Sequence, residues 1–304
     1  MVRISHIAPF AAALALIGGA AHAQNDGPPP AAVLAKANWF RIGEAVWIDA
    51  PDGKVKTRAY PSAKLGGHPV LVVLVHGDIP DPRQGLYELA DAVARISDNV
   101  VAAGLLRPGY TDAQGDTSAG KMGVAIGDNY TPQVVDDVDA AIRQLKARYH
   151  AGKVVVMGHS GGGAIVANLI GRHPEDVDAA VILSCGCDPN EFMTRWVLQH
   201  PRFQMIRPNP SLLPLDLAPK VPRRMHVRML IGDKDDVVLL PASQAYFNAL
   251  KSRGVDATFT VAPGFGHNDI FRAVQVRDAL VEALTLEGAT VRPPERSLVT
   301  AVKF

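Results

Sequence analysis

The chain has 304 residues and almost balanced charge, with 31 Lys and Arg against 30 Asp and Glu and a formal net charge of +1. This balance excludes a strongly basic surface, so we expect no nucleic-acid partner. The two cysteines are too few for a structural zinc site without histidines at ligand spacing, and we expect neither a metal nor another cofactor.

The first 23 residues have the pattern of a secretory signal peptide. Arg3 gives a positive start, residues 8–21 are almost entirely apolar, and Ala21-His22-Ala23 fits the small-x-small cleavage rule. A membrane anchor is the alternative, but the apolar run is shorter than the ~20 residues that span a bilayer. The sequence therefore predicts a periplasmic or secreted protein with no integral membrane segment after cleavage, and a loose leader over residues 24–36.

Short apolar strands alternate with helical patterns from about residue 37 onward. The strands are predicted at residues 39–48, 55–60, 70–75 and 99–105, and the helices at residues 86–96 and 131–149. This alternation is typical of an α/β domain whose mostly parallel sheet has helices on both faces. Thr131 can cap the second helix, and Pro132 suits its first turn. We expect the carboxylates of Asp136, Asp137 and Asp139 to be solvated rather than to bind a metal.

The stretch from residue 153 to residue 172 carries the strongest chemical signal. Residues 154–157 form an apolar, β-branched run, Gly158-His159-Ser160-Gly161-Gly162 follows, and residues 164–170 suit a buried helix. A Gly-x-Ser-x-Gly match between a strand and a helix makes a sharp turn that exposes the serine hydroxyl above the sheet edge. The pattern predicts Ser160 as a nucleophile, with a glycine-rich turn that has no chemical role as the alternative.

Residues 188–224 interrupt the alternation. After a predicted strand at residues 179–184, this stretch contains seven prolines and the aromatic residues Phe192, Trp196 and Phe203. We expect a small cap insertion that forms one wall of a pocket over the catalytic edge, with a surface insertion unrelated to substrate as the alternative. Cys185 and Cys187 just before it could form a disulfide in an oxidising compartment.

Two further loops supply the partners that an activated serine needs. Strands are predicted at residues 226–231 and 257–261, and helices at residues 241–252 and 269–286. Asp235 follows the first of these strands and His267 follows the second, so both side chains should reach the same sheet edge as Ser160. His267 is the only histidine after the Asp233 to Asp236 cluster, which nearly fixes the base. Asp235 has the best spacing for the acid, Asp236 is second, and Asp233 is third.

These motifs together resemble the α/β-hydrolase superfamily. They comprise residues 70–78, Arg107-Pro108-Gly109-Tyr110, the glycine turn around Ser160, Gly232-Asp233-Lys234-Asp235 and Gly264-Phe265-Gly266-His267. The similarity extends from about residue 39 to residue 286, and its nearest branch contains dienelactone-hydrolase-like and prolyl-oligopeptidase-like catalytic domains. The resemblance implies an α/β-hydrolase domain over residues 37–288 and leaves a C-terminal tail over residues 289–304. It also implies a triad of Ser160, Asp235 and His267, and an oxyanion hole from the backbone amides of Gly161 and Asp78.

The loop after the early strand departs from many relatives. It reads His76-Gly77-Asp78-Ile79-Pro80 in place of a triple glycine, so bulky tertiary-alcohol esters are less expected. A carboxylate at Asp78 would oppose a developing oxyanion unless it turned away. We expect this side chain to face the surface, with binding of a substrate ammonium group as the alternative.

The sequence thus favours a serine hydrolase that cleaves small carboxylic esters through a covalent acyl-enzyme. A small peptide or amide substrate would use the same machinery and is the first alternative. A catalytically idle α/β-hydrolase scaffold that binds a ligand or a partner is the second.

Overall fold

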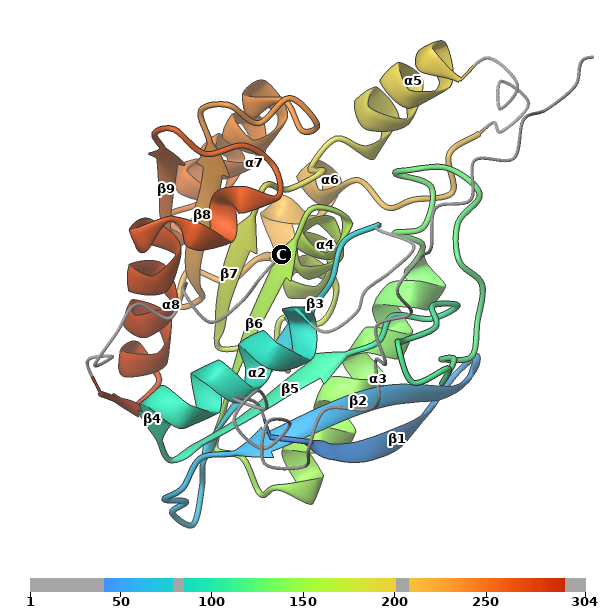
Figure 1. The fold of residues 1–304 in the computed structure, drawn as a ribbon. Coiled ribbons are helices and arrows are strands. Elements are labelled where there is room, and N and C mark those ends of the chain that lie inside the picture. The colour runs from blue at the N-terminus through green and yellow to red at the C-terminus, as the bar shows by residue number, and fades with distance from the viewer. Residues whose placement is uncertain (1–40, 79–84, 201–207, 293–304) are drawn as a thin grey trace, which may run out of the picture. The chain divides into compact units, whose positions relative to one another are not determined.

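The computed structural model describes residues 41–78, 85–200 and 208–292. The predicted signal peptide and leader lie outside these residues. The centre is an eight-stranded sheet in the order β1-β2-β5-β3-β6-β7-β8-β9 (Figure 1). Its strands are β1 (Glu44–Ala50), β2 (Gly53–Pro61), β3 (Val70–Val75), β5 (Val100–Leu105), β6 (Lys153–His159), β7 (Ala179–Leu183), β8 (His226–Gly232) and β9 (Asp256–Ala262). β2 is antiparallel to both of its neighbours, β1 and β5, and all pairs from β5 to β9 are parallel. The mostly parallel sheet is therefore confirmed.

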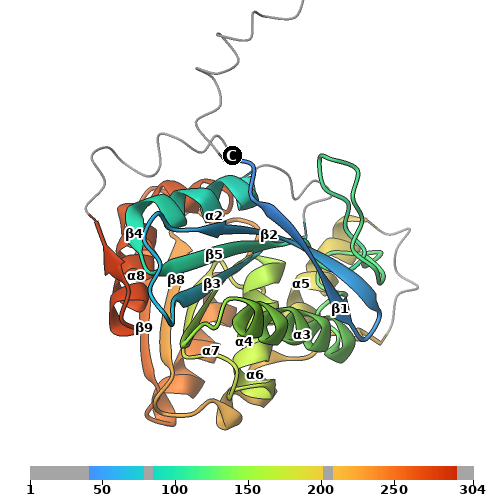
Figure 2. The ribbon, with the colours of Figure 1, turned by 90° about the horizontal axis from the view of Figure 1, so that it is seen from below.

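Helices cover both faces of this sheet, as the alternation predicts. Figure 2 shows α2 (Gly85–Ile96) and α8 (Val274–Leu286) on one side. On the other side lie α3 (Pro132–Arg148), α4 (Gly161–Arg172) and α7 (Leu240–Ser252). The predicted last helix is divided into a 3-10 turn, η3 (Asp269–Arg272), and α8. Among the described residues, no helix is both long enough and apolar enough to cross a bilayer.

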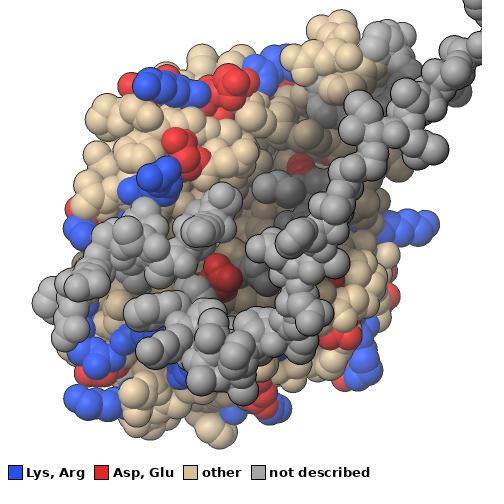
Figure 3. Space-filling view, in the orientation of Figure 1, with Lys and Arg blue, Asp and Glu red and all other residues tan. Residues whose placement is uncertain are grey.

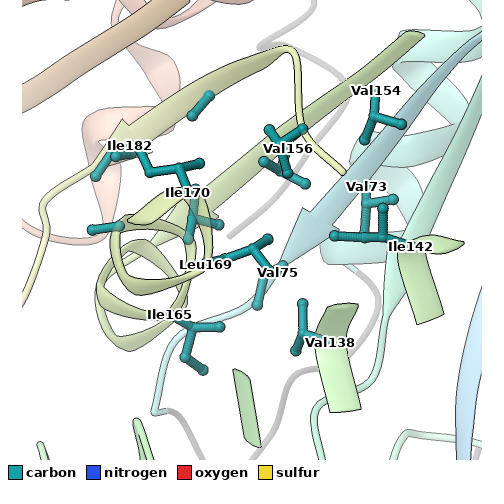
Figure 4. Packing of buried hydrophobic residues seen from close by; sticks show 14 of the residues in the cluster. Val73, Val75, Val138, Ile142, Val154, Val156, Ile165, Leu169, Ile170 and Ile182 are labelled. Atoms are coloured by element: carbon teal, nitrogen blue, oxygen red, sulfur yellow. The ribbon is translucent and has the colours of Figure 1, made fainter. Parts of the chain in front are cut away.

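The central strands are buried on both faces, which explains their apolar sequences. All six residues of β3 are buried. Val73 and Val75 point to the side of α3 and α4, where they pack with Val138, Ile142 and Ile165 (Figure 4). Val72 and Leu74 belong to the second cluster, on the side of α2 and α8. This covered sheet fixes the carboxyl ends of β3, β6, β8 and β9, from which the predicted site residues extend. On the surface, acidic and basic side chains are interspersed on the face shown in Figure 3.

At the start of α3, the predicted cap is confirmed, but the predicted exposure of the carboxylates is not. Thr131 accepts a hydrogen bond from the Val134 amide, and Pro132 is in the first turn. Asp137 and Asp139 were expected to be solvated, and this expectation is wrong, since both are buried. Asp137 is buried because its face of α3 packs on the β1–β2 hairpin, where the Asp52 amide donates to it. Asp139 lies instead beside Arg143 and His173, whose nitrogens are 2.8 and 3.8 Å from its carboxylate.

The insertion predicted over residues 188–224 has two parts in the structure. Helix α5 (Pro189–Gln199) lies beyond the carboxyl ends of the strands (Figure 1), and residues 201–207, with Phe203, lie outside the described residues. The later part turns back to the body of the domain as α6 (Pro214–Leu217) and η2 (Ala218–Lys220). A methyl group on Gly171 of α4 would come within 2.7 Å of Leu217, and Ala218 is fully buried in the core. This part of the insertion serves packing rather than covering a pocket.

Residues 290–292, which were predicted to belong to a C-terminal tail, are part of the domain. Residues Thr290–Val291 form β10, which pairs with β4 (Ser97–Asp98) in a second, two-stranded sheet. The Arg292 amide continues this pairing with a 2.7 Å hydrogen bond to the Ile96 carbonyl. The described domain therefore continues past residue 288.

Candidate active site

Ser160 lies in a turn that few residues could form. It follows β6 directly and precedes α4, with φ 56° and ψ −122°, a region that non-glycine residues seldom adopt. A methyl group on Gly158 would collide with the Gly162 carbonyl oxygen, and one on Gly162 would collide with the Val75 carbonyl oxygen. The glycines of the motif are thus required by close backbone contacts, which hold the serine at the carboxyl edge of the sheet.

His267 bridges Ser160 and Asp235. Its Nε2 lies 2.9 Å from the Ser160 Oγ, and its Nδ1 lies 3.0 Å from each carboxylate oxygen of Asp235. Because a carboxylate only accepts, Nδ1 carries the proton and Nε2 accepts from the serine hydroxyl. The structure thus brings together the three residues that the sequence nominated, across separations of 32 and 107 positions.

Burial distinguishes Asp235 from its neighbours. Its side chain is fully buried and also accepts from the amides of Val237 and Val238 at 3.1 and 2.9 Å. Burial by itself would raise the pKa of the Asp235 carboxyl, but the hydrogen bond and charge of His267 lower that pKa below its ordinary value. Asp236 and Asp233 are exposed, and Asp233 accepts from the Gly264 amide instead.

A second histidine, which the sequence analysis missed, supports the loop of the first. The His159 Nε2 donates to the His267 carbonyl at 2.8 Å, and the two ring centroids are 4.8 Å apart. Burial lowers the pKa of His159 to about 3, so this ring is neutral. Its place inside the Gly-x-Ser-x-Gly motif was the available signal, but no local pattern indicates what the ring contacts.

The two predicted oxyanion donors lie beside the serine. Gly161 is the first residue of α4, so its amide has no acceptor within the helix and lies at the helix's positive end. A methyl group on Gly77 would come within 2.9 Å of the Ser160 Cβ, which places the loop that continues into Asp78 against the nucleophile. The arrangement could stabilise negative charge on a bound carbonyl oxygen.

The expectation that Asp78 faces the surface is wrong. Its side chain is 8% exposed and lies 2.7 Å from the Arg107 Nη1. The Tyr130 hydroxyl donates to it at 2.6 Å and the Gly127 amide at 3.3 Å. A buried carboxylate requires such partners, and here the protein itself supplies them, which leaves little for a substrate ammonium group to replace.

Arg107 also contacts the loop that carries Asp78. Its amide donates to the His76 Nε2 at 3.0 Å, and its Nη1 lies 3.3 Å from the His76 carbonyl. The His76 Nδ1 donates to the Gly77 carbonyl at 2.8 Å. Burial and the neighbouring Arg107 charge lower the pKa of His76 to about 3, so this histidine is neutral as well.

Cys185 and Cys187 form a disulfide with a Cα–Cα distance of 5.0 Å. Both residues are buried. The Gly186 amide between them donates to the Ser160 carbonyl at 3.4 Å. The bridge therefore lies in the loop after β7 that contacts the serine turn.

The chain is similar in sequence to known hydrolases. The family model of serine aminopeptidases, S33, matches residues 85–224, a range that includes Ser160 but neither Asp235 nor His267. The acylamino-acid-releasing enzyme of Sus scrofa is 26% identical over 172 residues, which cover 51% of this chain and 23% of that enzyme. The chain thus spans about a quarter of the length of this relative.

Solved structures of two kinds superpose on the domain. A puromycin-hydrolyzing peptidase of Mycobacterium tuberculosis gives a TM-score of 0.63 at 22% identity, covering 82% of this chain and 39% of that one. A putative dienelactone hydrolase of Klebsiella pneumoniae gives a TM-score of 0.57 at 16% identity, covering 80% of this chain and 98% of that one.

The sheet order, the serine turn and these matches define the fold as that of the α/β-hydrolases. Proteins that are similar to the chain include a putative dienelactone hydrolase and two peptidase-type enzymes. The predicted α/β-hydrolase fold is confirmed.

Proposed function

We propose that the protein is an exported serine hydrolase that cleaves small carboxylic esters through a Ser160 acyl-enzyme. The observation that carries the proposal is the hydrogen-bonded path from the Ser160 hydroxyl through His267 to the buried Asp235. A serine hydroxyl becomes a useful nucleophile when a neutral imidazole accepts its proton, and the carboxylate keeps that imidazole in the required tautomer.

In the acylation step, the Ser160 Oγ attacks the ester carbonyl carbon while its proton moves to the His267 Nε2. Asp235 stabilises the imidazolium, and the amides of Gly161 and Asp78 donate to the oxyanion. The intermediate then expels the alcohol, which takes the proton from His267. Water repeats the sequence with His267 as the base, and the carboxylic acid leaves.

Hydrolysis of a small peptide or amide is the second candidate. It is favoured by the match to the serine aminopeptidase model and by the similarity to an acylamino-acid-releasing enzyme and a puromycin-hydrolyzing peptidase. The same residues would act, but the amine is a poorer leaving group and depends more on the proton from His267. Ester hydrolysis demands less of the site, and we place it first for that reason.

Export is part of the proposal. Support comes from the signal-like first 23 residues and from the Cys185–Cys187 disulfide, because disulfides persist mainly in oxidising compartments. Sequencing the N-terminus of the protein from fractionated cells should give a start near Gln24 in the periplasm or medium. An uncleaved cytosolic chain would contradict export but would leave the proposed Ser160 hydrolysis unaffected.

A fluorophosphonate probe and a substrate panel test the chemistry. The wild type should be labelled at Ser160 and should hydrolyse short p-nitrophenyl acyl esters, whereas Ser160→Ala should do neither while keeping its melting temperature. Aminoacyl and prolyl p-nitroanilides separate the two candidates. Turnover of the amides with none of the esters would favour the peptidase, and a folded wild type that the probe does not label would point to an idle binding scaffold.

A further inference from the structure

The buried pair of Asp78 and Arg107 lies directly beside the proposed oxyanion hole. A methyl group on Gly161 would collide with an Asp78 carboxylate oxygen, so this carboxylate lies against the residue whose amide would bind the oxyanion. A negative charge there repels the negative charge that forms during acyl transfer. Catalysis therefore requires that the negative charge of Asp78 be compensated, and Ser160, His267 and Asp235 do not supply a positive charge at this position.

Arg107 supplies the compensating charge. Its side chain is fully buried and is held on two sides by aromatic rings, with the guanidinium carbon 5.0 Å from the Tyr110 ring centroid and 6.0 Å from that of Tyr130. Its Nη1 contacts both the Asp78 carboxylate and the His76 carbonyl. One cation thus contacts the two residues on either side of Gly77, the residue that packs against Ser160.

Stability is a poor explanation for this arrangement. Within the described residues, the Arg107 Nε and Nη2 are buried without hydrogen-bond partners, and a buried ion pair that leaves donors unsatisfied adds little net stability. Apolar side chains of similar volume in place of both members of the pair would fill the space at a lower desolvation cost. A role in charge placement explains why a cation is present.

We propose that Arg107 is a positioning residue for acyl transfer. It holds Asp78 so that the Asp78 backbone amide faces the oxyanion, and the Arg107 charge offsets the charge of the Asp78 carboxylate. This inference rests on the proposed function. The Tyr130 hydroxyl and the Gly127 amide hold the other carboxylate oxygen. Arg107 itself need not touch the substrate, because it acts through the loop of residues 76–78.

The first test uses the fluorophosphonate reaction, whose phosphoryl oxygen should occupy the same hole and which requires no knowledge of the natural substrate. Arg107→Met should slow labelling of Ser160 and lower kcat for a p-nitrophenyl ester by about 10- to 100-fold, with KM changed less than about threefold. Arg107→Lys should recover part of the rate, because it restores the charge without the guanidinium geometry.

The double variant separates charge from structure. Adding Asp78→Asn to Arg107→Met should raise kcat at least about fivefold above Arg107→Met alone, since it removes the unbalanced carboxylate. If Arg107→Met does not fold, Tyr130→Phe gives the same test in milder form, with an expected kcat loss of about three- to tenfold from one missing hydrogen bond.

Arg228→Met is the matched control. Arg228 is also buried and ion-paired, with Asp256 and Glu282, but it lies on β8 away from the serine turn. Its loss should lower the melting temperature and leave kcat within about twofold. The inference is overturned if folded Arg107→Met keeps wild-type kcat, or if Asp78→Asn deepens its defect. A wild type that the probe fails to label would instead overturn the proposed function, and the inference with it.

Discussion

At the scale of single residues, burial decides the chemistry of carboxylates that look alike in sequence. Asp233, Asp235 and Asp236 occupy one short loop, and the one whose side chain is buried contacts His267. Asp78 also lies in a loop rich in turn residues, yet Arg107 and Tyr130 enclose it. In both places, the side chains that pair with the carboxylate come from distant parts of the chain.

The acid assignment gives a paired prediction. Asp235→Asn should lower kcat for a p-nitrophenyl ester by about 10²- to 10⁴-fold, because the amide no longer fixes the His267 tautomer or balances the imidazolium. Asp236→Asn, an equivalent change at an exposed neighbour, should stay within about twofold of wild type. Steady-state kinetics on the two variants decides the matter, and equal losses would show that the acid is assigned wrongly.

At the scale of elements, local signals in the sequence determine where helices and strands begin. Thr131 and Pro132 fix the start of α3, and the glycines around Ser160 allow the strand-to-helix turn. The insertion at residues 188–224 carries weaker local signals. Its later helices are therefore placed by packing against α4 rather than by their own sequence pattern.

The cap of α3 can be tested by a conservative pair. Thr131→Ala removes the acceptor for the Val134 amide and should lower the free energy of unfolding by about 1 kcal/mol, with kcat unchanged. Thr131→Ser keeps a hydroxyl and should lose less than half as much. Urea unfolding curves would measure both, and an equal loss in the two variants would mean that the methyl group matters rather than the cap.

At the scale of the whole molecule, buried carboxylates make stability depend on pH. Burial on the inner face of α3 raises the pKa of Asp137 to about 6, from an ordinary value of 3.8. The folded protein therefore binds more protons than the unfolded chain between these pH values, and the contribution of Asp137 to stability falls as the pH rises from about 4 to about 6. Asp139, whose pKa burial also raises to about 6, adds to the same trend.

Asp137→Asn should weaken this dependence. The amide keeps an acceptor for the Asp52 amide but cannot ionise, so the free energy of unfolding of the variant relative to wild type should rise by about 1–3 kcal/mol between pH 4 and pH 7.5. Urea unfolding of both proteins at both pH values gives this change in free energy. The contribution of Asp139 is the same in wild type and variant, so it does not affect the difference. A difference that does not vary with pH would mean that Asp137 is ionised in the folded protein throughout this range.

The sequence by itself determined the alternation of strands and helices, the tight turn at Ser160 and the order of serine, aspartate and histidine. These features depend on local causes: apolar periodicity, glycine geometry and helix capping, each contained within a few residues. Because parallel strands end at one edge of the sheet, this order was enough to nominate Ser160, Asp235 and His267.

The tertiary structure decided which polar side chains are buried and which protein groups replace water as their hydrogen-bond or ion-pair partners. His76, His159, Arg107 and Tyr130 carried no local signal of their contacts, and Asp78, Asp137 and Asp139 were placed in solvent by the sequence and in the interior by the fold. Burial depends on neighbours that are tens of residues away, as with Asp78 and Tyr130, which are 52 positions apart. The charge balance around the serine is set by those distant neighbours.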